Sequence, residues 1–260
     1  MILYLSGTGN TKWAAKSLAN ALGEQIIDIA KINASNFEFA EKGNGIIGIC
    51  FPVHGWRPPN LLVDFVKKMR IAKQSFRNTY IFLLCTEGDN TGRAMPYLEH
   101  LLSLRGITVN AYYDVRMPNT YVGLPFMDVD SKDVEEMKLK KAQERISEIY
   151  NKIKERTETY NIVFEGKWPK TDTLLLGAVF NNLLVTDKFF NVNEKECARC
   201  GKCAAVCPVE NIKWNKGQIP IWKHNKKCMT CFACYHNCSK HAIQYGLATH
   251  GKGQYHFHED

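Results

Sequence analysis

The chain has 260 residues, of which 45% are apolar, 23% charged and 11% aromatic. This is the composition of an ordinary globular protein that can bury a substantial core, so it excludes a disordered or fibrous chain and is compatible with two domains. The formal net charge of +8 at pH 7 favours an acidic partner, and the most apolar stretch, 174–185, is too short for a membrane span.

The first 160 residues alternate short apolar runs with longer amphipathic ones, which is the pattern of a parallel sheet with crossover helices. Expected strands cover residues 2–5, 25–29, 45–51, 79–85 and 107–115. Expected helices cover residues 11–22, 60–69, 92–104 and 131–154. Within the last helix, 138–145 is interpreted as a solvated face. We predict an α/β fold with a doubly wound five-stranded parallel sheet of order 2-1-3-4-5, followed by a smaller α+β domain.

The first expected strand runs directly into the loop Ser6-Gly7-Thr8-Gly9-Asn10-Thr11, and a helix begins at once. Backbone amides and three hydroxyl groups therefore stand at a helix N-terminus, where hydrogen bonds and the helix dipole hold a phosphate. The loop lacks the third glycine of a dinucleotide fingerprint, and Lys12 does not complete a Gly-Lys-Ser/Thr loop. A mononucleotide phosphate fits better, although Ser, Thr and Asn are also ordinary helix caps.

Two turn-rich loops follow the third and fourth strands, Pro52-Val53-His54-Gly55-Trp56 and Thr86-Glu87-Gly88-Asp89. In a sheet of this order the ligand lies outside the carboxyl ends of the strands, so both loops are placed to wrap a planar ring.

Several side chains in these loops have two interpretations. Trp56 either stacks on the ring or packs between loop and helix. His54 is either a proton-transfer group or an ordinary loop histidine. Glu87 and Asp89 would disfavour an anionic reduced ring if they point inward.

The chain is expected to divide into three parts: 1–160 binds the nucleotide, 161–190 is an apolar linker or interface segment, and 191–260 is a cysteine-rich domain with a C-terminal tail. The cysteine-rich part is an internal repeat, because each cysteine group precedes a short segment that contains isoleucine, 211–213 and 241–243. His256 and His258 are metal-binding candidates, but a solvated or docked terminus is the simpler interpretation.

Eight of the ten cysteines lie between residues 197 and 238. They form two copies of one spacing, Cys197-x2-Cys200-x2-Cys203-x3-Cys207-Pro208 and Cys228-x2-Cys231-x2-Cys234-x3-Cys238. In this pattern three thiolates of one loop bind one cubane, and the fourth cysteine ligates the other. The spacing predicts two [4Fe-4S] clusters, one held by Cys197, Cys200, Cys203 and Cys238 and the other by Cys228, Cys231, Cys234 and Cys207.

The alternative for these cysteines is a pair of zinc ribbons. Zinc takes four ligands from two Cys-x2-Cys pairs, which fits the repeated triplets poorly. Ser239 replaces the second proline of the cluster pattern, a change expected to alter local geometry without abolishing ligation. Cys50 and Cys85 lie at the ends of expected strands and are interpreted as small core residues.

The cysteine count also bears on compartment and charge. Nothing at the N-terminus is typical of a signal peptide, so we expect a cytosolic protein whose thiols are not in disulfides. Two oxidised clusters with their thiolates carry about −2 each, which lowers the net charge from +8 to about +4. We therefore expect an acidic redox partner protein, no nucleic acid and no membrane span.

Together these residues resemble the flavodoxin and ferredoxin fusion proteins, in which a flavodoxin-like domain precedes a bacterial-type two-cluster ferredoxin domain. Residues 6–11 look like the flavodoxin phosphate loop, 52–56 look like its second flavin loop, and Met117-Pro118-Asn119-Thr120-Tyr121 looks like a loop common in the fusion family. The resemblance covers nearly the whole chain. It implies an FMN beside the two [4Fe-4S] clusters.

The sequence departs from flavodoxins in one respect. Flavodoxins commonly place the ring between two aromatic side chains, but residues 86–92 contain none. Tyr97 or Tyr121 would then substitute, or one face of the ring stays open to a substrate or partner.

Three functions are compatible with these features. The resemblance implies an electron carrier that passes single electrons between the clusters and the FMN. The alternative is an FMN-dependent oxidoreductase that acts on a small molecule with the clusters as electron feed. A nucleic-acid-binding or scaffold protein with structural metal is favoured by the charge but disfavoured by the cysteine spacing.

Overall fold

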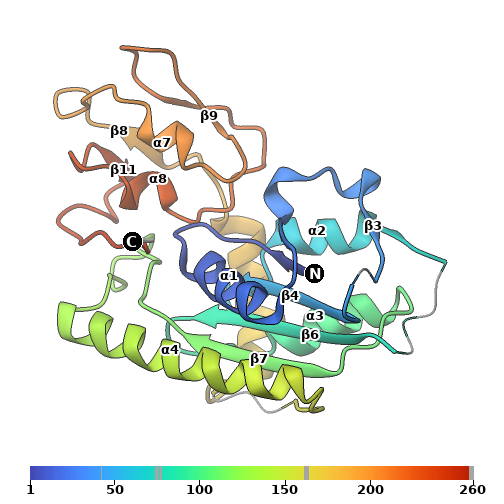
Figure 1. Ribbon diagram of the computed structural model, residues 1–260. Coiled ribbons are helices and arrows are strands. Elements are labelled where there is room, and N and C mark those ends of the chain that lie inside the picture. The colour runs from blue at the N-terminus through green and yellow to red at the C-terminus, as the bar shows by residue number, and fades with distance from the viewer. Residues whose placement is uncertain (42, 74–75, 77, 161–163, 258–260) are drawn as a thin grey trace.

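The structure is a computed structural model that describes residues 1–41, 43–73, 76, 78–160 and 164–257. Residues 161–163 of the expected linker and His258 of the tail lie outside the described residues. The N-terminal part forms layers of helices on a sheet, and a smaller lobe of short strands and helices stands above it (Figure 1).

The N-terminal part is built on one parallel sheet of order β2-β1-β4-β6-β7. Its strands are β1 (Ile2–Tyr4), β2 (Ile26–Asp28), β4 (Ile46–Pro52), β6 (Tyr80–Glu87) and β7 (Ala111–Arg116). Among these five strands the order is 2-1-3-4-5, so the predicted doubly wound fold is confirmed. The central strands β4 and β6 are buried on both faces, which is why their sequences are continuous apolar runs.

Helices cover both faces of this sheet. One face packs against α1 (Asn10–Leu22) and α4 (Lys132–Lys154), and the other against α2 (Asn60–Lys68) and α3 (Ala94–Ser103). Each of the four lies close to a predicted helix. The prediction missed only short elements here: the 3-10 turns η1 (Ile29–Lys31) and η2 (Ala34–Asn36), and the paired strands β3 (Glu38–Phe39) and β5 (Arg70–Ile71).

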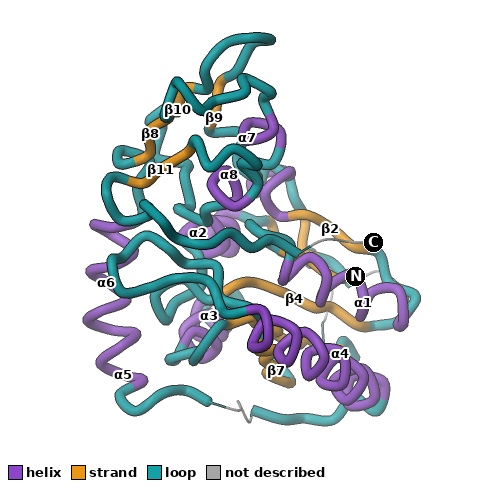
Figure 2. Tube along the Cα trace, turned by 90° about the vertical axis from the view of Figure 1, so that its left-hand side faces the viewer, coloured by secondary structure: helices purple, strands orange, loops and turns teal. Residues whose placement is uncertain are grey.

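The expected apolar linker contains a helical rod. Its successive parts are α5 (Pro169–Thr171), the π-helix η3 (Asp172–Leu176), α6 (Gly177–Val179) and the π-helix η4 (Phe180–Leu184). The rod runs along one side of the molecule (Figure 2). Thr173 and Asn181 are buried, whereas Leu174 and Leu183 are exposed, so the rod turns one face toward the protein. The expected domain boundaries at residues 160 and 190 stay predictions.

The C-terminal lobe is the predicted small α+β domain. Strand β8 (Phe190–Val192) pairs antiparallel with β11 (Ile243–Tyr245), and β9 (Ile212–Lys213) pairs antiparallel with β10 (Ile221–Trp222). The short helices α7 (Lys202–Ala205) and α8 (Ala233–His236) follow the two cysteine loops. Across the described residues, none of the helices combines the length and apolar character that crossing a membrane requires.

Candidate functional site

A cavity of about 380 Å³ lies at the carboxyl edge of the sheet, where the loops after β1, β4, β6 and β7 meet. Its size is typical of sites that bind cofactors and other small molecules. All of the predicted cofactor-binding residues line it except Gly9. The structure therefore gathers three loops that are far apart in the sequence around one space.

The first loop offers an anion cradle at the start of the 13-residue helix α1. Thr11 Oγ1 lies 2.7 Å from Thr86 Oγ1, and Asn10 Nδ2 donates to the carbonyl oxygen of Pro118 at 3.1 Å. These bonds fix the loop and leave residues 6–8 half-buried at the cavity. Amide groups and the helix dipole at this point favour a phosphate.

The C-terminal tail covers the back of the same loop. The amide of Phe257 donates to the carbonyl oxygen of Thr8 at 2.8 Å, and Tyr255 Oη donates to Asn10 Oδ1 at 2.8 Å. Gly9 lies under Phe257, since a Cβ at Gly9 would stand 2.9 Å from the Cβ of Phe257. The tail had two interpretations, metal binding or a solvated or docked terminus, and residues 255 and 257 are docked in the structure.

The second loop is pinned to the helical rod. Gly55 has a left-handed backbone (φ 53°), and a Cβ there would lie 2.4 Å from Cδ1 of Phe180. Asn181 Nδ2 donates to the carbonyl oxygen of His54 at 3.0 Å. Leu176, Val179, Phe180 and Leu184 of the rod also line the cavity. The apolar sequence of this segment predicted a linker or an interface, and nothing in it indicated a wall of the site.

Burial lowers the pKa of His54 to about 4, because a desolvated imidazole loses the hydration of its charged form. At neutral pH the ring is therefore uncharged, with one nitrogen that donates and one that accepts a hydrogen bond. His54 lines the cavity and can bind a polar edge of a ligand. A role in proton transfer stays a prediction.

Of the aromatic side chains considered as partners of the ring, two lie at the cavity and one does not. Trp56 and Tyr121 line the cavity, whereas Tyr97 is not among its lining residues and instead has the guanidinium of Arg57 5.2 Å from its ring centre. The Tyr121 ring makes edge contacts with Phe180 at 5.2 Å and Phe232 at 5.4 Å between ring centres. Of the two substitutes considered for the missing aromatic, the structure places Tyr121 at the site.

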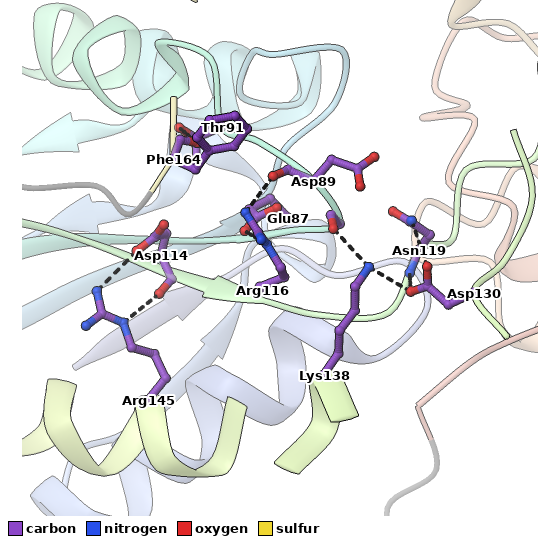
Figure 3. A network of polar contacts seen from close by, with 11 residues as sticks. Glu87, Asp89, Thr91, Asp114, Arg116, Asn119, Asp130, Lys138, Arg145 and Phe164 are labelled. Atoms are coloured by element: carbon purple, nitrogen blue, oxygen red, sulfur yellow. Dashed lines mark hydrogen bonds and ion pairs between the residues drawn. The ribbon is translucent and has the colours of Figure 1, made fainter. Parts of the chain in front are cut away.

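The third loop brings a buried carboxylate to the cavity. Glu87 is 6% exposed and accepts a hydrogen bond at Oε1 from Arg116 Nε at 3.1 Å (Figure 3). Its Oε2 is buried without a hydrogen-bond partner in the described part of the chain. Burial raises the pKa of Glu87, and Arg116 acts against this rise. Asp89, by contrast, is exposed. An unpaired buried carboxylate oxygen is costly and commonly marks a functional position.

The interpretation of residues 138–145 as a solvated face was wrong for Lys138, which is 7% exposed. Its Nζ donates to the carbonyl oxygen of Gly88 at 2.9 Å and to Asp130 Oδ2 at 2.7 Å (Figure 3). Asp130 in turn accepts hydrogen bonds from the backbone and side-chain amides of Asn119. Lys138 thus ties the third loop to the loop after β7.

The eight cysteines of the repeat lie in the C-terminal lobe, and all ten cysteines of the chain are free. Burial is the main cause that raises the pKa of Cys203 to about 11, and the neighbouring thiols of Cys238, Cys197 and Cys200 contribute to this rise. These are the four side chains of the first predicted ligand set. Crowded thiols without a compensating cation resist ionisation, and iron supplies that positive charge.

The second predicted set shows the same relation. Burial is the main cause that raises the pKa of Cys228 to about 12, and the thiols of Cys231 and Cys207 contribute to this rise. Burial also raises the pKa of Cys234 well above its usual value, and Cys231, Cys228 and Cys207 add to this. The fourth cysteine of each half therefore lies beside the three-cysteine loop of the other half. This is the crossed arrangement that two cubanes need.

Backbone amides support the cysteine sulfurs. The amide of Asn211 donates to Cys207 Sγ at 3.2 Å, and that of Thr230 donates to Cys228 Sγ at 3.4 Å. Within the described ranges, no three His, Cys, Asp or Glu side chains are grouped to hold a single metal ion. Cys50 and Cys85 are fully buried strand residues, as predicted.

Comparison with known proteins identifies the C-terminal lobe. Residues 190–239 match the 4Fe-4S dicluster domain family, so this part of the chain is an iron–sulfur domain with two clusters. No curated protein sequence matches the chain.

Solved structures resemble the N-terminal part. They include a flavodoxin from Streptococcus pneumonia TIGR4, with 16% identity over 57% of this chain and 97% of that one and a TM-score of 0.35. An azoreductase from Bacillus anthracis has 12% identity over 58% and 98% of the two chains and a TM-score of 0.39. A flavoprotein from Lactobacillus acidophilus in complex with FMN has 14% identity over 44% and 90%, with a TM-score of 0.33.

At these identities and TM-scores, the N-terminal fold is assigned from the strand order of the chain itself. The order 2-1-3-4-5 is the flavodoxin-like order of doubly wound sheets. The chain therefore joins a flavodoxin-like domain to a 4Fe-4S dicluster domain, an arrangement that fits the flavodoxin and ferredoxin fusion proteins.

Proposed function

We propose that this protein is an electron carrier that binds FMN in the cavity and passes single electrons between the FMN and two [4Fe-4S] clusters. One observation carries the proposal: Cys231, a predicted cluster ligand, lines the same cavity as the phosphate loop. A flavin in this cavity and a cluster on Cys231 would be immediate neighbours. Such proximity is what electron exchange between two cofactors requires.

The residues present fit both kinds of cofactor. Ser6, Thr8 and the amides at the start of α1 would hold the single phosphate of FMN, since these groups meet at one helix N-terminus beside the cavity. Trp56 and Tyr121 are the predicted ring partners that line the cavity, beside Phe180 and Phe232, and neutral His54 can hydrogen-bond the polar edge of the ring.

The crossed thiol sets would hold the clusters. Cys197, Cys200, Cys203 and Cys238 form one set, and Cys228, Cys231, Cys234 and Cys207 form the other. When bound, the flavin supplies one- and two-electron chemistry and the clusters supply one-electron chemistry. The chain itself sets distances, keeps water away from the buried thiols and donates amide hydrogen bonds to sulfur.

The proposal predicts the composition of the purified protein. Anaerobically prepared material is expected to contain eight iron atoms in two clusters of four, an equal amount of acid-labile sulfide and one FMN per chain. Iron, sulfide and flavin assays with mass spectrometry of the released flavin measure these contents. Colourless protein that contains zinc and no sulfide would disprove the account.

A second function has an observation in its favour. The cavity wall also includes apolar side chains, such as Leu124, Met127 and Val179, beside the predicted ring position. A small apolar substrate could be reduced or oxidised there by the flavin, with the clusters as electron feed. Anaerobic reduction in the presence of candidate acceptors distinguishes the two, because a carrier shows no specific turnover of an organic molecule.

The external partner is proposed to be an acidic redox protein. With two oxidised clusters the net charge is about +4, which favours encounter with a negatively charged surface. We also propose a cytosolic location, because all ten cysteines are free in the structure and cytosolic thiols are kept reduced.

The buried carboxylate of Glu87 is expected to lower the reduction potential of the flavin. A charge about 10 Å away contributes on the order of 1–2 kcal/mol at an effective dielectric constant near 20, which corresponds to roughly 50–80 mV for one electron. Glu87→Gln should therefore raise the potential by about that amount. Redox titration of the FMN absorbance measures it.

The control for this prediction is Glu136→Gln, because Glu136 is exposed on α4 and is not among the described lining residues of the cavity, so its charge is screened by water and salt. The effect of Glu87→Gln should also depend on pH. Below the raised pKa of Glu87 the wild-type side chain is already neutral, so the difference between the two proteins should shrink as the pH falls. Equal shifts for the two variants would contradict the assigned role.

A further inference from the structure

We propose that the two clusters have fixed and different places in the electron path. The cluster held by Cys228, Cys231, Cys234 and Cys207 exchanges electrons directly with the flavin, and the cluster held by Cys197, Cys200, Cys203 and Cys238 lies one step further out. We call them the inner and outer cluster. The inference rests on the proposed function and adds the order of transfer and the residue that sets it.

The wall of the cavity is asymmetric between the two cysteine loops. Residues 229–232 of the second cysteine loop line the cavity, and Met229, Thr230 and Phe232 are each no more than 5% exposed. No cysteine of the first loop is among the described lining residues. The two loops are halves of one repeat, so their different surroundings come from how the lobe sits on the sheet domain.

Gly7 of the phosphate loop lies directly against the second cysteine loop. A Cβ at this position would stand 2.6 Å from the Cβ of Cys231 and 3.0 Å from its Sγ. The backbone of Gly7 does not need a left-handed conformation, so the glycine is required here for its size alone. Gly7 thus lets a cluster ligand touch the phosphate loop, and we assign it as the positioning residue for the inner cluster.

The outer cluster faces away from the cavity. Cys200 is exposed, whereas Cys234 of the inner set is buried. In Figure 1, α8 lies lower in the lobe than α7 and nearer to α1. Cys203 of the outer set and Cys234 of the inner set belong to one buried cluster of side chains, so the two ligand sets are neighbours. The arrangement orders the path as solvent side, outer cluster, inner cluster, flavin.

Two contacts keep this spacing constant. The tail bond from the Phe257 amide to the Thr8 carbonyl joins the lobe to the phosphate loop. On the other side of the lobe, Thr230 Oγ1 donates to the carbonyl oxygen of Thr186 at 3.1 Å, next to the inner cysteines. Each electron passed from the inner cluster oxidises that cluster by one equivalent and reduces the flavin by one, so the exchange needs no further reactant.

A matched pair of variants tests the order. Cys231→Ala removes one thiol from the inner set, and Cys200→Ala removes one from the outer set. In partly reduced wild-type protein, a neighbouring paramagnetic cluster should speed the spin relaxation of the flavin radical, measured by EPR power saturation. We expect loss of this enhancement in Cys231→Ala and its retention in Cys200→Ala, with iron assays showing which cluster remains. The opposite pattern, or retention in both, would overturn the proposal.

A milder variant covers the case in which a cysteine variant loses both clusters. Gly7→Ala keeps every cysteine ligand but places a methyl group against Cys231. It should lose part of the enhancement in those molecules that still hold flavin, iron and sulfide, and assays of the three contents give that fraction. Unchanged relaxation in Gly7→Ala would reject the assigned role of Gly7. Wild-type protein that binds clusters but no flavin would refute the proposed function instead, which separates the two failures.

Discussion

Gly55→Ala is expected to lower the free energy of unfolding by roughly 2–5 kcal/mol and to abolish flavin binding. Two costs add at this position. The left-handed backbone (φ 53°) is unfavourable for alanine, and the new methyl group would overlap the ring of Phe180 at 2.4 Å. The loop formed by residues 52–56 would then separate from the helical rod, which opens one wall of the cavity. Chemical denaturation and flavin fluorescence titration measure the two effects.

Gly23→Ala and Gly106→Ala are the controls for this prediction. Both glycines have left-handed backbones (φ 67° and 73°), and a Cβ at either would meet no atom within 4 Å. Alanine at either position carries the cost of the left-handed backbone without the overlap. The free energy of unfolding of each variant should therefore fall by about 1–2 kcal/mol, and its flavin affinity should be unchanged. A Gly55 variant that behaves like these two would show that the contact with Phe180 does not shape the site.

Lys138→Met is expected to cost about 3–5 kcal/mol of stability, because it leaves the buried carboxylate of Asp130 without its cationic partner. The ammonium group also holds the carbonyl of Gly88 at 2.9 Å, so the third loop should loosen and flavin affinity should fall. Denaturant unfolding and calorimetric titration with FMN measure both changes.

Lys140→Met provides the comparison on the same helix. Lys140 is exposed, and an exposed substitution away from any contact usually changes stability by no more than about 0.5 kcal/mol. If the two lysine variants unfold alike, then the buried ion pair contributes little and the third loop is held by other contacts.

Much of the site could be predicted because its residues follow regular rules. A parallel sheet brings the carboxyl ends of its strands to one edge, so loops 6–11, 52–56 and 86–89 had to meet once the strand order was known. The cysteine spacing is similarly direct, since ligands on one short loop need no long-range information. These local patterns predicted both the cavity and the thiol sets.

The missed features depend on long-range packing. Lys138 belongs to a strongly charged helix, and nothing in its neighbours distinguishes it from Lys140 until Asp130 and Gly88 are placed beside it. The helical rod looked like a linker because its sequence is apolar without a clear polar face. Its role in the wall depends on contacts between distant parts of the chain, such as Gly55 with Phe180 and the His54 carbonyl with Asn181.

The segment that carries Tyr255 and Phe257 has a consequence for kinetics. Carriers that deliver electrons on a swinging arm slow down in viscous media, because each transfer waits for a diffusive rearrangement. Here the lobe is fastened to the loop after β1 by the bonds of Tyr255 to Asn10 and of Phe257 to Thr8. Internal transfer in this protein would then depend on distance and driving force, and thickening the solvent with glycerol would leave its rate unchanged.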